Sequence, residues 1–203
     1  MNSNLSIERE SPFQPVSADY FKARHSNIQK ILRYYPNACR GDVQHFFLTG
    51  KKATGKTSLV EFVKQYLADR GNALGIYVSN KGKYSLETLV VSIFEAFLNN
   101  VGEEFFERSF ESLFGGIESV EFTNSKIRFK PKEETSRKLV VGFHYILNDL
   151  IEEFKDYDCI FLVIDDINGL SDEEEFVNWY KDLVKNCVGF YIFASPDNKI
   201  ILL

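Results

Sequence analysis

The sequence predicts an α/β fold with a central parallel sheet, and three observations support this class. A short apolar segment at 46–48 leads through a glycine-containing loop into a helical pattern at 56–70. A longer apolar run at 159–164 is unbroken, as is typical of a central strand buried on both faces. Strand and helix patterns also alternate along the chain, which is the order that gives parallel strands joined by crossover helices.

Length and composition limit the chain to one sizeable core. Its 203 residues, 44% of them hydrophobic, suffice for one full α/β domain with additional elements. The net charge of −5 does not favour wide contacts with nucleic acid, which stays an open but unsupported partner, or with anionic lipid. The three cysteines are widely spaced, and the N-terminus lacks an apolar segment. We therefore expect a cytoplasmic protein with reduced thiols and no signal peptide or membrane anchor.

The first half of the chain is read from apolar spacing and from turn residues. Gly71 and Asn72 end the helix that follows the glycine-containing loop, and Ser85 has the character of an N-cap. We expect an extended lead-in at 1–18 and a core at 19–203. The first elements expected in the core are a helix at 19–34, a loop at 36–42, a strand at 46–48, a helix at 56–70, a strand at 74–78 and a helix at 85–99.

The second half begins with an insertion at about 84–131 relative to a minimal core. Within it the apolar period changes to two on either side of the turn at 123–125, which predicts a β-hairpin. The elements expected from there are a helical piece at 103–113, the hairpin at 120–129, a long amphipathic helix at 133–154, a strand at 159–164, a helix at 172–185 and a final strand at 189–194.

The glycine-containing loop has the spacing of a phosphate-binding motif. Gly50, Gly55, Lys56 and Thr57 fit G-x-x-x-x-G-K-[ST] without a mismatch. Backbone N–H groups of such a loop, together with the N-terminus of the following helix, cradle phosphate oxygens. Lys56 would reach the β- and γ-phosphates, and the Thr57 hydroxyl would bind Mg²⁺. The predicted nucleotide-binding residues are Gly50, Lys51, Ala53, Thr54, Gly55, Lys56, Thr57 and Ser58.

Three polar residues follow later strands of the predicted sheet. Asp165 and Asp166 follow the apolar run at 159–164, and Ser195 follows the last strand. In open parallel sheets ligands bind at the carboxyl ends of the strands, where the phosphate loop also lies. Asp165 would hold Mg²⁺, Asp166 would orient or deprotonate an attacking water, and Ser195 would reach the γ-phosphate or that water. Lys56, Asp166 and Ser195 are thus the predicted catalytic residues.

With these motifs the chain resembles the AAA+ class of P-loop ATPases, and within it the STAND and archaeal-type ATPases. The resemblance covers roughly residues 15–200, with Gly50 to Thr57 as the first motif, Asp165-Asp166 as the second and Ser195 at the sensor position. It implies a P-loop NTPase three-layer sandwich and ATP hydrolysis to ADP and phosphate with Mg²⁺. In place of the Gly-Arg-Glu often found near the start of the family, the chain has Lys22-Ala23-Arg24-His25.

The family also has parts that this sequence does not contain. A fifth strand, an arginine finger and a helical lid would follow Ser195, so we expect the chain to belong to a longer protein. The resemblance then implies a nucleotide-driven switch that acts through further domains or protein partners and is compatible with oligomerisation.

Three other functions share some of these features. A GTPase would need Asn-Lys-x-Asp, whereas Asn80-Lys81-Gly82-Lys83 lacks the aspartate and follows the second strand. A P-loop kinase would carry an arginine-rich lid, but no arginine follows Arg137. A nucleotide-gated interaction module with little turnover is also consistent with the aromatic content. Its candidate partner-facing residues are Phe105, Phe106, Phe110 and Phe114, which would otherwise pack on the sheet.

Overall fold

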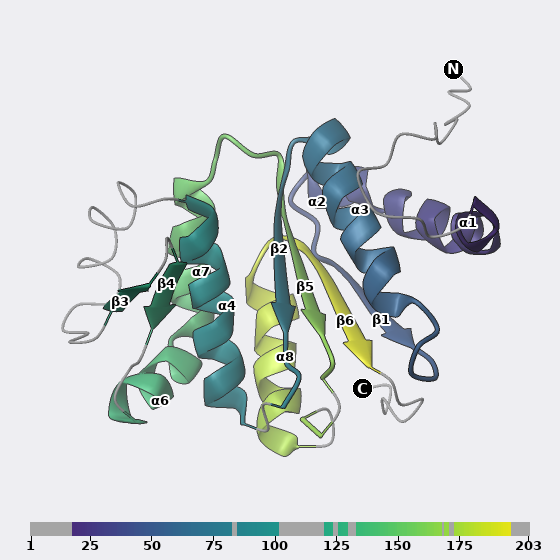
Figure 1. Ribbon diagram of the computed structural model, residues 1–203. Coiled ribbons are helices and arrows are strands. Elements are labelled where there is room, and N and C mark those ends of the chain that lie inside the picture. Colours follow the sequence, from purple (N-terminus) through teal and green to yellow (C-terminus); the bar gives the residue numbers. More distant parts are fainter. Residues whose placement is uncertain are drawn as a thin grey trace.

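The computed structural model describes residues 18–82, 85–101, 120–123, 126–129, 133–167, 169–170 and 173–195. Within these residues the chain forms three layers, with a parallel sheet between two sets of helices (Figure 1). The expected α/β class and three-layer arrangement are therefore confirmed. None of the helices in the described ranges is long and apolar enough to cross a membrane.

The central sheet has four strands, and all neighbouring pairs are parallel. They are β1 (Gln44–Thr49), β2 (Ala73–Ser79), β5 (Cys159–Asp165) and β6 (Phe190–Ser195), arranged in the order β1-β6-β5-β2. All seven residues of β5 are buried, as the apolar run predicted. Since every strand runs the same way, all four carboxyl ends meet at one edge of the sheet.

One face of the sheet is covered by α3 (Lys56–Gly71), with α1 (Ala18–Leu32) packed on that helix. Buried Val60 and Val63 of α3 lie in one cluster with Val163 of β5. The expected helix at 19–34 ends at Leu32, and the expected loop at 36–42 begins with a one-turn helix, α2 (Tyr35–Ala38). A proline in the first turn explains this difference, because its fixed φ suits a helix start that needs no N–H donor there.

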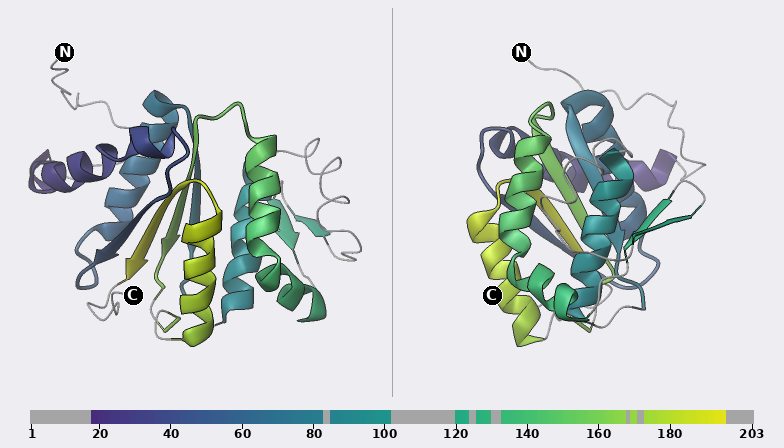
Figure 2. Two further views of the ribbon diagram at one scale, coloured as in Figure 1. Left: turned by 180° about the vertical axis from the view of Figure 1, so that it is seen from behind. Right: turned by 90° about the vertical axis from the view of Figure 1, so that its left-hand side faces the viewer.

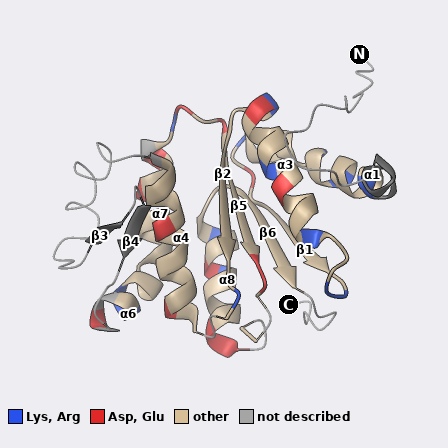
Figure 3. Cartoon of the chain, viewed as in Figure 1, with Lys and Arg blue, Asp and Glu red and all other residues tan. Residues whose placement is uncertain are grey.

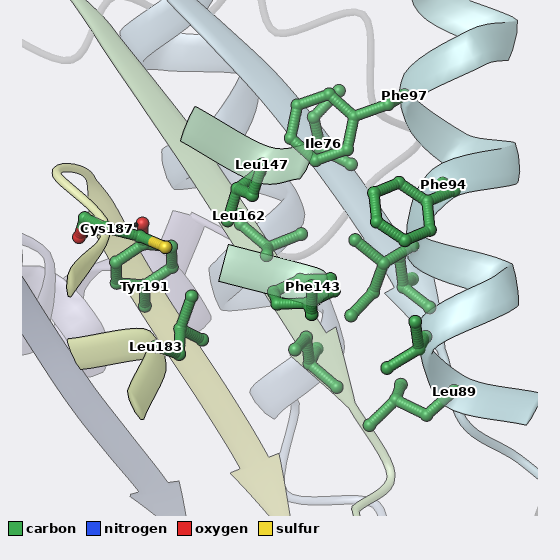
Figure 4. Packing of buried hydrophobic residues seen from close by; sticks show 14 of the residues in the cluster. Ile76, Leu89, Phe94, Phe97, Phe143, Leu147, Leu162, Leu183, Cys187 and Tyr191 are labelled. Carbon is green, nitrogen blue, oxygen red and sulfur yellow. Dashed lines mark hydrogen bonds between the residues drawn. The ribbon is translucent and has the colours of Figure 1, made fainter. Parts of the chain in front are cut away.

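The opposite face carries the larger core, to which α4 (Leu86–Val101), α7 (Phe143–Glu153) and α8 (Glu174–Asn186) contribute. Seen from behind, α8 lies in front of the sheet (Figure 2). Figure 4 shows Phe94 and Phe97 of α4 facing Ile76 and Leu162 of the sheet. Together with the α3 cluster on the other face, burial of these large side chains fixes the sheet from both sides, so that its carboxyl edge is a rigid base for a site.

The helix expected at 133–154 is divided in two. α6 (Glu133–Val141) stops before Gly142, and α7 begins at Phe143 and runs in a different direction (Figure 1). Gly142 has a ψ of 3°, well away from the helical value, although its N–H still bonds to the Lys138 carbonyl at 2.8 Å. A Cβ at Gly142 would lie 3.1 Å from that same carbonyl oxygen. A single long helix was therefore the wrong prediction.

The expected hairpin forms, with β3 (Val120–Thr123) antiparallel to β4 (Lys126–Phe129). Val120 pairs with Phe129 and Thr123 with Lys126, so the pair makes a separate small sheet. β4 lies beside α4, on the far side of that helix from the central strands (Figure 1). The helical piece expected at 103–113, with its four phenylalanines, lies outside the described residues.

Candidate phosphate-binding site

The carboxyl edge of the sheet brings the predicted site residues to one end of the molecule. The loop from Gly50 to Gly55 follows β1, Asp165 ends β5, and Ser195 ends β6, which lies between them. Ser195 pairs in register with Thr49, the last residue before the loop. Lysines occur in the loop and acidic residues at the end of β5, so residues of opposite charge lie at the same edge of the sheet (Figure 3).

The loop turns through three residues with positive φ. Gly50 has φ 148°, Ala53 has 63° and Gly55 has 79°, after which α3 begins at Lys56. Glycine adopts such angles without steric cost, whereas Ala53 is an exception that the surrounding loop must hold in place. Gly55 precedes α3 without a side-chain cap, so the first N–H groups of that helix remain available to an anion.

Lys56 folds back over the loop. Its Nζ donates to the carbonyl oxygens of Gly50 at 2.7 Å and of Lys51 at 3.0 Å. The Thr54 hydroxyl also donates to the Lys51 carbonyl, at 2.9 Å. These bonds hold the ammonium group at the centre of the loop, beside exposed Lys51 and Lys52. The loop therefore concentrates positive charge where a phosphate group would fit.

Thr57 and Asp165 are joined directly. The Thr57 hydroxyl, in the first turn of α3, donates to Asp165 Oδ2 at 2.6 Å across 108 positions of sequence. Asp165 is only 2% exposed, and its Oδ1 accepts the N–H of Asp166 at 2.9 Å. A buried carboxylate needs such donors, because its charge is otherwise costly to remove from water. The two residues predicted as metal ligands thus lie together.

Asp166 adopts the left-handed conformation, with φ 59°. Aspartate and asparagine tolerate this region better than other non-glycine residues. The residue is half-buried, and its carbonyl oxygen accepts a hydrogen bond from Asn80 Nδ2 at 3.4 Å. The chain therefore turns sharply directly after Asp165, which leaves the Asp166 side chain at the same edge of the sheet as the loop.

Ser195 lies deeper than the other predicted residues. It is 1% exposed, on the strand between the one that leads into the loop and the one that ends in Asp165. In the turn that follows β5, the N–H of Ile167 donates to the Ala194 carbonyl at 3.1 Å. The Ser195 hydroxyl is consequently held inside the sheet edge rather than on its open surface.

The side chain of Arg24 contacts the backbone of the loop. Its guanidinium Nη2 donates to the Thr54 carbonyl at 2.5 Å, which ties α1 to the loop. The sequence placed Arg24 only at an imperfectly matched position of a family motif. The structure gives it a definite neighbour, since a hydrogen bond to the loop carbonyl restrains the backbone between Ala53 and Gly55.

Tyr77 and Asn80 belong to the site and were missed from the sequence. The Tyr77 hydroxyl donates to Asp165 Oδ2 at 3.0 Å. Asn80 is 1% exposed, and its backbone N–H donates to the Asp165 carbonyl at 2.8 Å. In the sequence, Asn80 is only the start of an incomplete Asn-Lys-x-Asp motif. Its position directly after β2 is the signal that could have placed it at this edge, where the strand ends meet.

The donor set suits a hard cation shared with phosphate. Thr57 and Asp165 offer oxygen atoms, which Mg²⁺ prefers, and the cation usually completes its shell with phosphate oxygens and water. No group of three or more His, Cys, Asp or Glu residues that could hold a metal occurs in the described ranges.

A cavity of about 290 Å³ lies elsewhere. Val140, Phe143 and Trp179 are among the residues that line it, from helices on the face opposite α3. Val141, at its rim, is 78% exposed, and nearby Tyr145 is 69% exposed. This hollow is separate from the phosphate loop.

Similarity to known proteins is limited. No family model and no curated protein matches the sequence. Thirteen chains of solved structures match, among them one from the structure of Drosophila ORC bound to GC-rich DNA and Cdc6. That match has 13% identity and a TM-score of 0.41, and covers 94% of this chain. This chain spans about half of the matched one, 54% of its length. At this level of similarity the match carries no information on ligands or partners.

Proposed function

We propose that this chain is an ATP- and Mg²⁺-binding domain of the AAA+ and STAND type, which hydrolyses ATP as a nucleotide-driven switch. The observation that carries the proposal is the 2.6 Å hydrogen bond between Thr57 Oγ1 and Asp165 Oδ2. It joins the end of a phosphate-loop motif to an acidic strand end that was expected, because of that motif, to bind the same metal. A glycine-rich surface loop without a ligand has no need of a buried carboxylate against its helix.

Each residue of the site has a distinct part in this function. Loop N–H groups and the N-terminus of α3 bind the phosphates, and Lys56 exchanges its loop carbonyls for phosphate oxygens. Mg²⁺, when bound, neutralises charge that develops on the phosphates. Thr57 and Asp165 are the residues that would hold it. Asp166, at the same edge, would orient the attacking water.

ATP is favoured over GTP by the position of Asn80. The amide that would have to read a guanine base donates instead to the Asp166 carbonyl, at 3.4 Å. Asn80 is also 1% exposed. Its amide therefore supports the acidic turn and is not presented to a ligand.

Replacement of Lys56 tests nucleotide binding. Lys56→Ala removes the cation at the centre of the loop, so ATP affinity should fall at least about 100-fold, the loss of a charge-assisted bond in a site built for charge. Isothermal titration calorimetry with ATP and Mg²⁺ measures this loss, and thermal unfolding shows that the fold is retained.

Lys185→Ala is the matched control for this experiment. Lys185 is exposed in the last turn of α8, on the other face of the sheet. Its replacement changes the net charge equally and should leave ATP affinity unchanged. Undiminished ATP affinity in Lys56→Ala would contradict the proposed site.

Replacement of Asp166 separates binding from hydrolysis. Asn tolerates the φ of 59° at this position, so Asp166→Asn should keep the turn and bind ATP normally. It lacks the carboxylate that orients water, and we expect turnover to fall about 100-fold or more. Phosphate release under single-turnover conditions measures the effect. Equal turnover in the variant and the wild type would remove Asp166 from the mechanism.

Phosphate release by the wild type also distinguishes ATP hydrolysis from a second candidate function. If the wild type binds ATP but releases no phosphate, the chain is a nucleotide-gated interaction module. The observation that favours this function is the exposure of Val141, which lines the cavity formed mainly by α6, α7 and α8, since an exposed apolar side chain in a hollow is typical of contact surfaces.

A further inference from the structure

Asp165 accepts one hydrogen bond more than the two predicted motifs supply. Its Oδ2 accepts the Thr57 hydroxyl at 2.6 Å and also the Tyr77 hydroxyl at 3.0 Å. With the Asp166 N–H on Oδ1, the carboxylate has three donors on two oxygens. Thr57 and Asp166 belong to the predicted motifs, whereas Tyr77 comes from a different strand.

The register of the sheet explains how Tyr77 reaches this carboxylate. Tyr77 on β2 pairs with Val163 on β5, and Asp165 pairs with Ser79. Side chains alternate between the faces of a strand, so Tyr77, Val163 and Asp165 share one face. That face is the one covered by α3, where Tyr77 packs at the edge of the core. The phenol therefore runs diagonally toward the end of the neighbouring strand, within reach of a long aromatic side chain.

The Tyr77 ring is itself fixed by α3. The Lys64 ammonium lies over the ring, 5.6 Å from its centroid, and forms an ion pair with Glu61 at 2.8 Å. The stem of Lys64 crosses Gly75, where a Cβ would approach its Cγ to 2.5 Å. The absence of a side chain at Gly75 thus leaves room for a lysine that covers the ring. The direction of the hydroxyl is set by packing on one side and by Asp165 on the other.

We propose that Tyr77 is a positioning residue that locks the Asp165 carboxylate in the orientation needed for Mg²⁺, which deepens and rests on the function proposed above. A carboxylate in the outer shell of a metal binds well only when its rotamer is already ordered. Tyr77 orders it in the absence of ligand, from a strand that carries no part of either motif.

Tyr77→Phe tests this role, because it removes the hydroxyl and keeps the ring. ATP affinity is measured by calorimetry across a Mg²⁺ series and in EDTA. We expect the Mg²⁺ concentration for half-maximal strengthening of ATP binding to rise about tenfold, as for other residues that orient a metal ligand. ATP affinity in EDTA should not change, since Tyr77 touches no phosphate-binding group. A purely structural effect would instead change ATP affinity equally with Mg²⁺ and in EDTA, or would change only the melting temperature.

Two further variants make the outcome decisive. Tyr66→Phe removes a hydroxyl from α3, near the same core, and should leave the Mg²⁺ dependence unchanged. Asp165→Asn should abolish that dependence. If Asp165→Asn abolishes it while Tyr77→Phe matches the wild type, the positioning role is overturned and the proposed function stands. If the wild type binds no ATP at all, the proposed function falls, and the positioning role falls with it. Failure of Tyr77→Phe to fold would make the hydroxyl structural and would also overturn the inference.

Discussion

At the scale of single residues, Gly75 and Lys64 together determine how Tyr77 packs beside Asp165. Gly75 lies on β2 directly beneath Lys64, and Lys64 covers the ring of Tyr77. Gly75 does not have a positive φ, so its backbone would accept alanine, and an alanine in a strand is normally more stable than a glycine. The space beneath the lysine stem is therefore what requires glycine here.

Gly75→Ala tests this requirement through a double-mutant cycle with Lys64→Ala. In the wild type the new Cβ would meet Lys64 Cγ at 2.5 Å, and we expect the free energy of unfolding to fall by about 1–3 kcal/mol. Once Lys64 is alanine the clash is gone, and Gly75→Ala should become neutral or stabilising. Urea unfolding of the four proteins measures both values. An equal loss in both backgrounds would show that Gly75 is needed for another reason.

At the scale of elements, the order of strands and helices was predicted well and the breaks between them were not. Apolar spacing runs through Leu139, Phe143 and Leu147 as if one helix continued, because a kink at Gly142 leaves the buried side chains in phase. Propensity gives only a weak signal against a glycine in a helix. The short α2 was similarly hidden by residues that suit a loop as well as a helix start.

Prediction of the site failed where it depended on pairing between strands. Thr57 could be assigned from the sequence because it completes the G-x-x-x-x-G-K-[ST] spacing. Asp165 could be assigned because it follows a long apolar run in a chain that also has that loop. Tyr77 could not, since its contact with Asp165 follows from the register of β2 against β5. Nothing in a single strand specifies its neighbour or its register. Residues that support a motif from an adjacent strand are for this reason the hardest to find from sequence.

At the scale of the whole molecule, the carboxyl edge of the sheet is held together by backbone bonds outside the regular ladders. Asn80 N–H bonds to the Asp165 carbonyl at 2.8 Å, and Ile167 N–H bonds to the Ala194 carbonyl at 3.1 Å. These two bonds connect the ends of β2, β5 and β6. The opposite edge has its own bond, from Asp158 N–H to the Asn72 carbonyl at 3.0 Å. Local opening that breaks the bonds at one edge does not require the bond at the other edge to break.

A ligand at the phosphate loop should stabilise the first edge and leave the second unchanged. With ATP and Mg²⁺ at about 100 times the Kd, any opening that destroys the site becomes costlier by roughly 2.7 kcal/mol, or about 100-fold in exchange rate. We expect hydrogen exchange at the Asn80 and Ile167 amides to slow by up to this factor, while exchange at Asp158 stays the same. Lys56→Ala, mixed with the same ATP, should show no change at either edge. Equal slowing at all three amides would mean that they exchange only through global unfolding, and that the carboxyl edge does not act as a separate unit that responds to nucleotide.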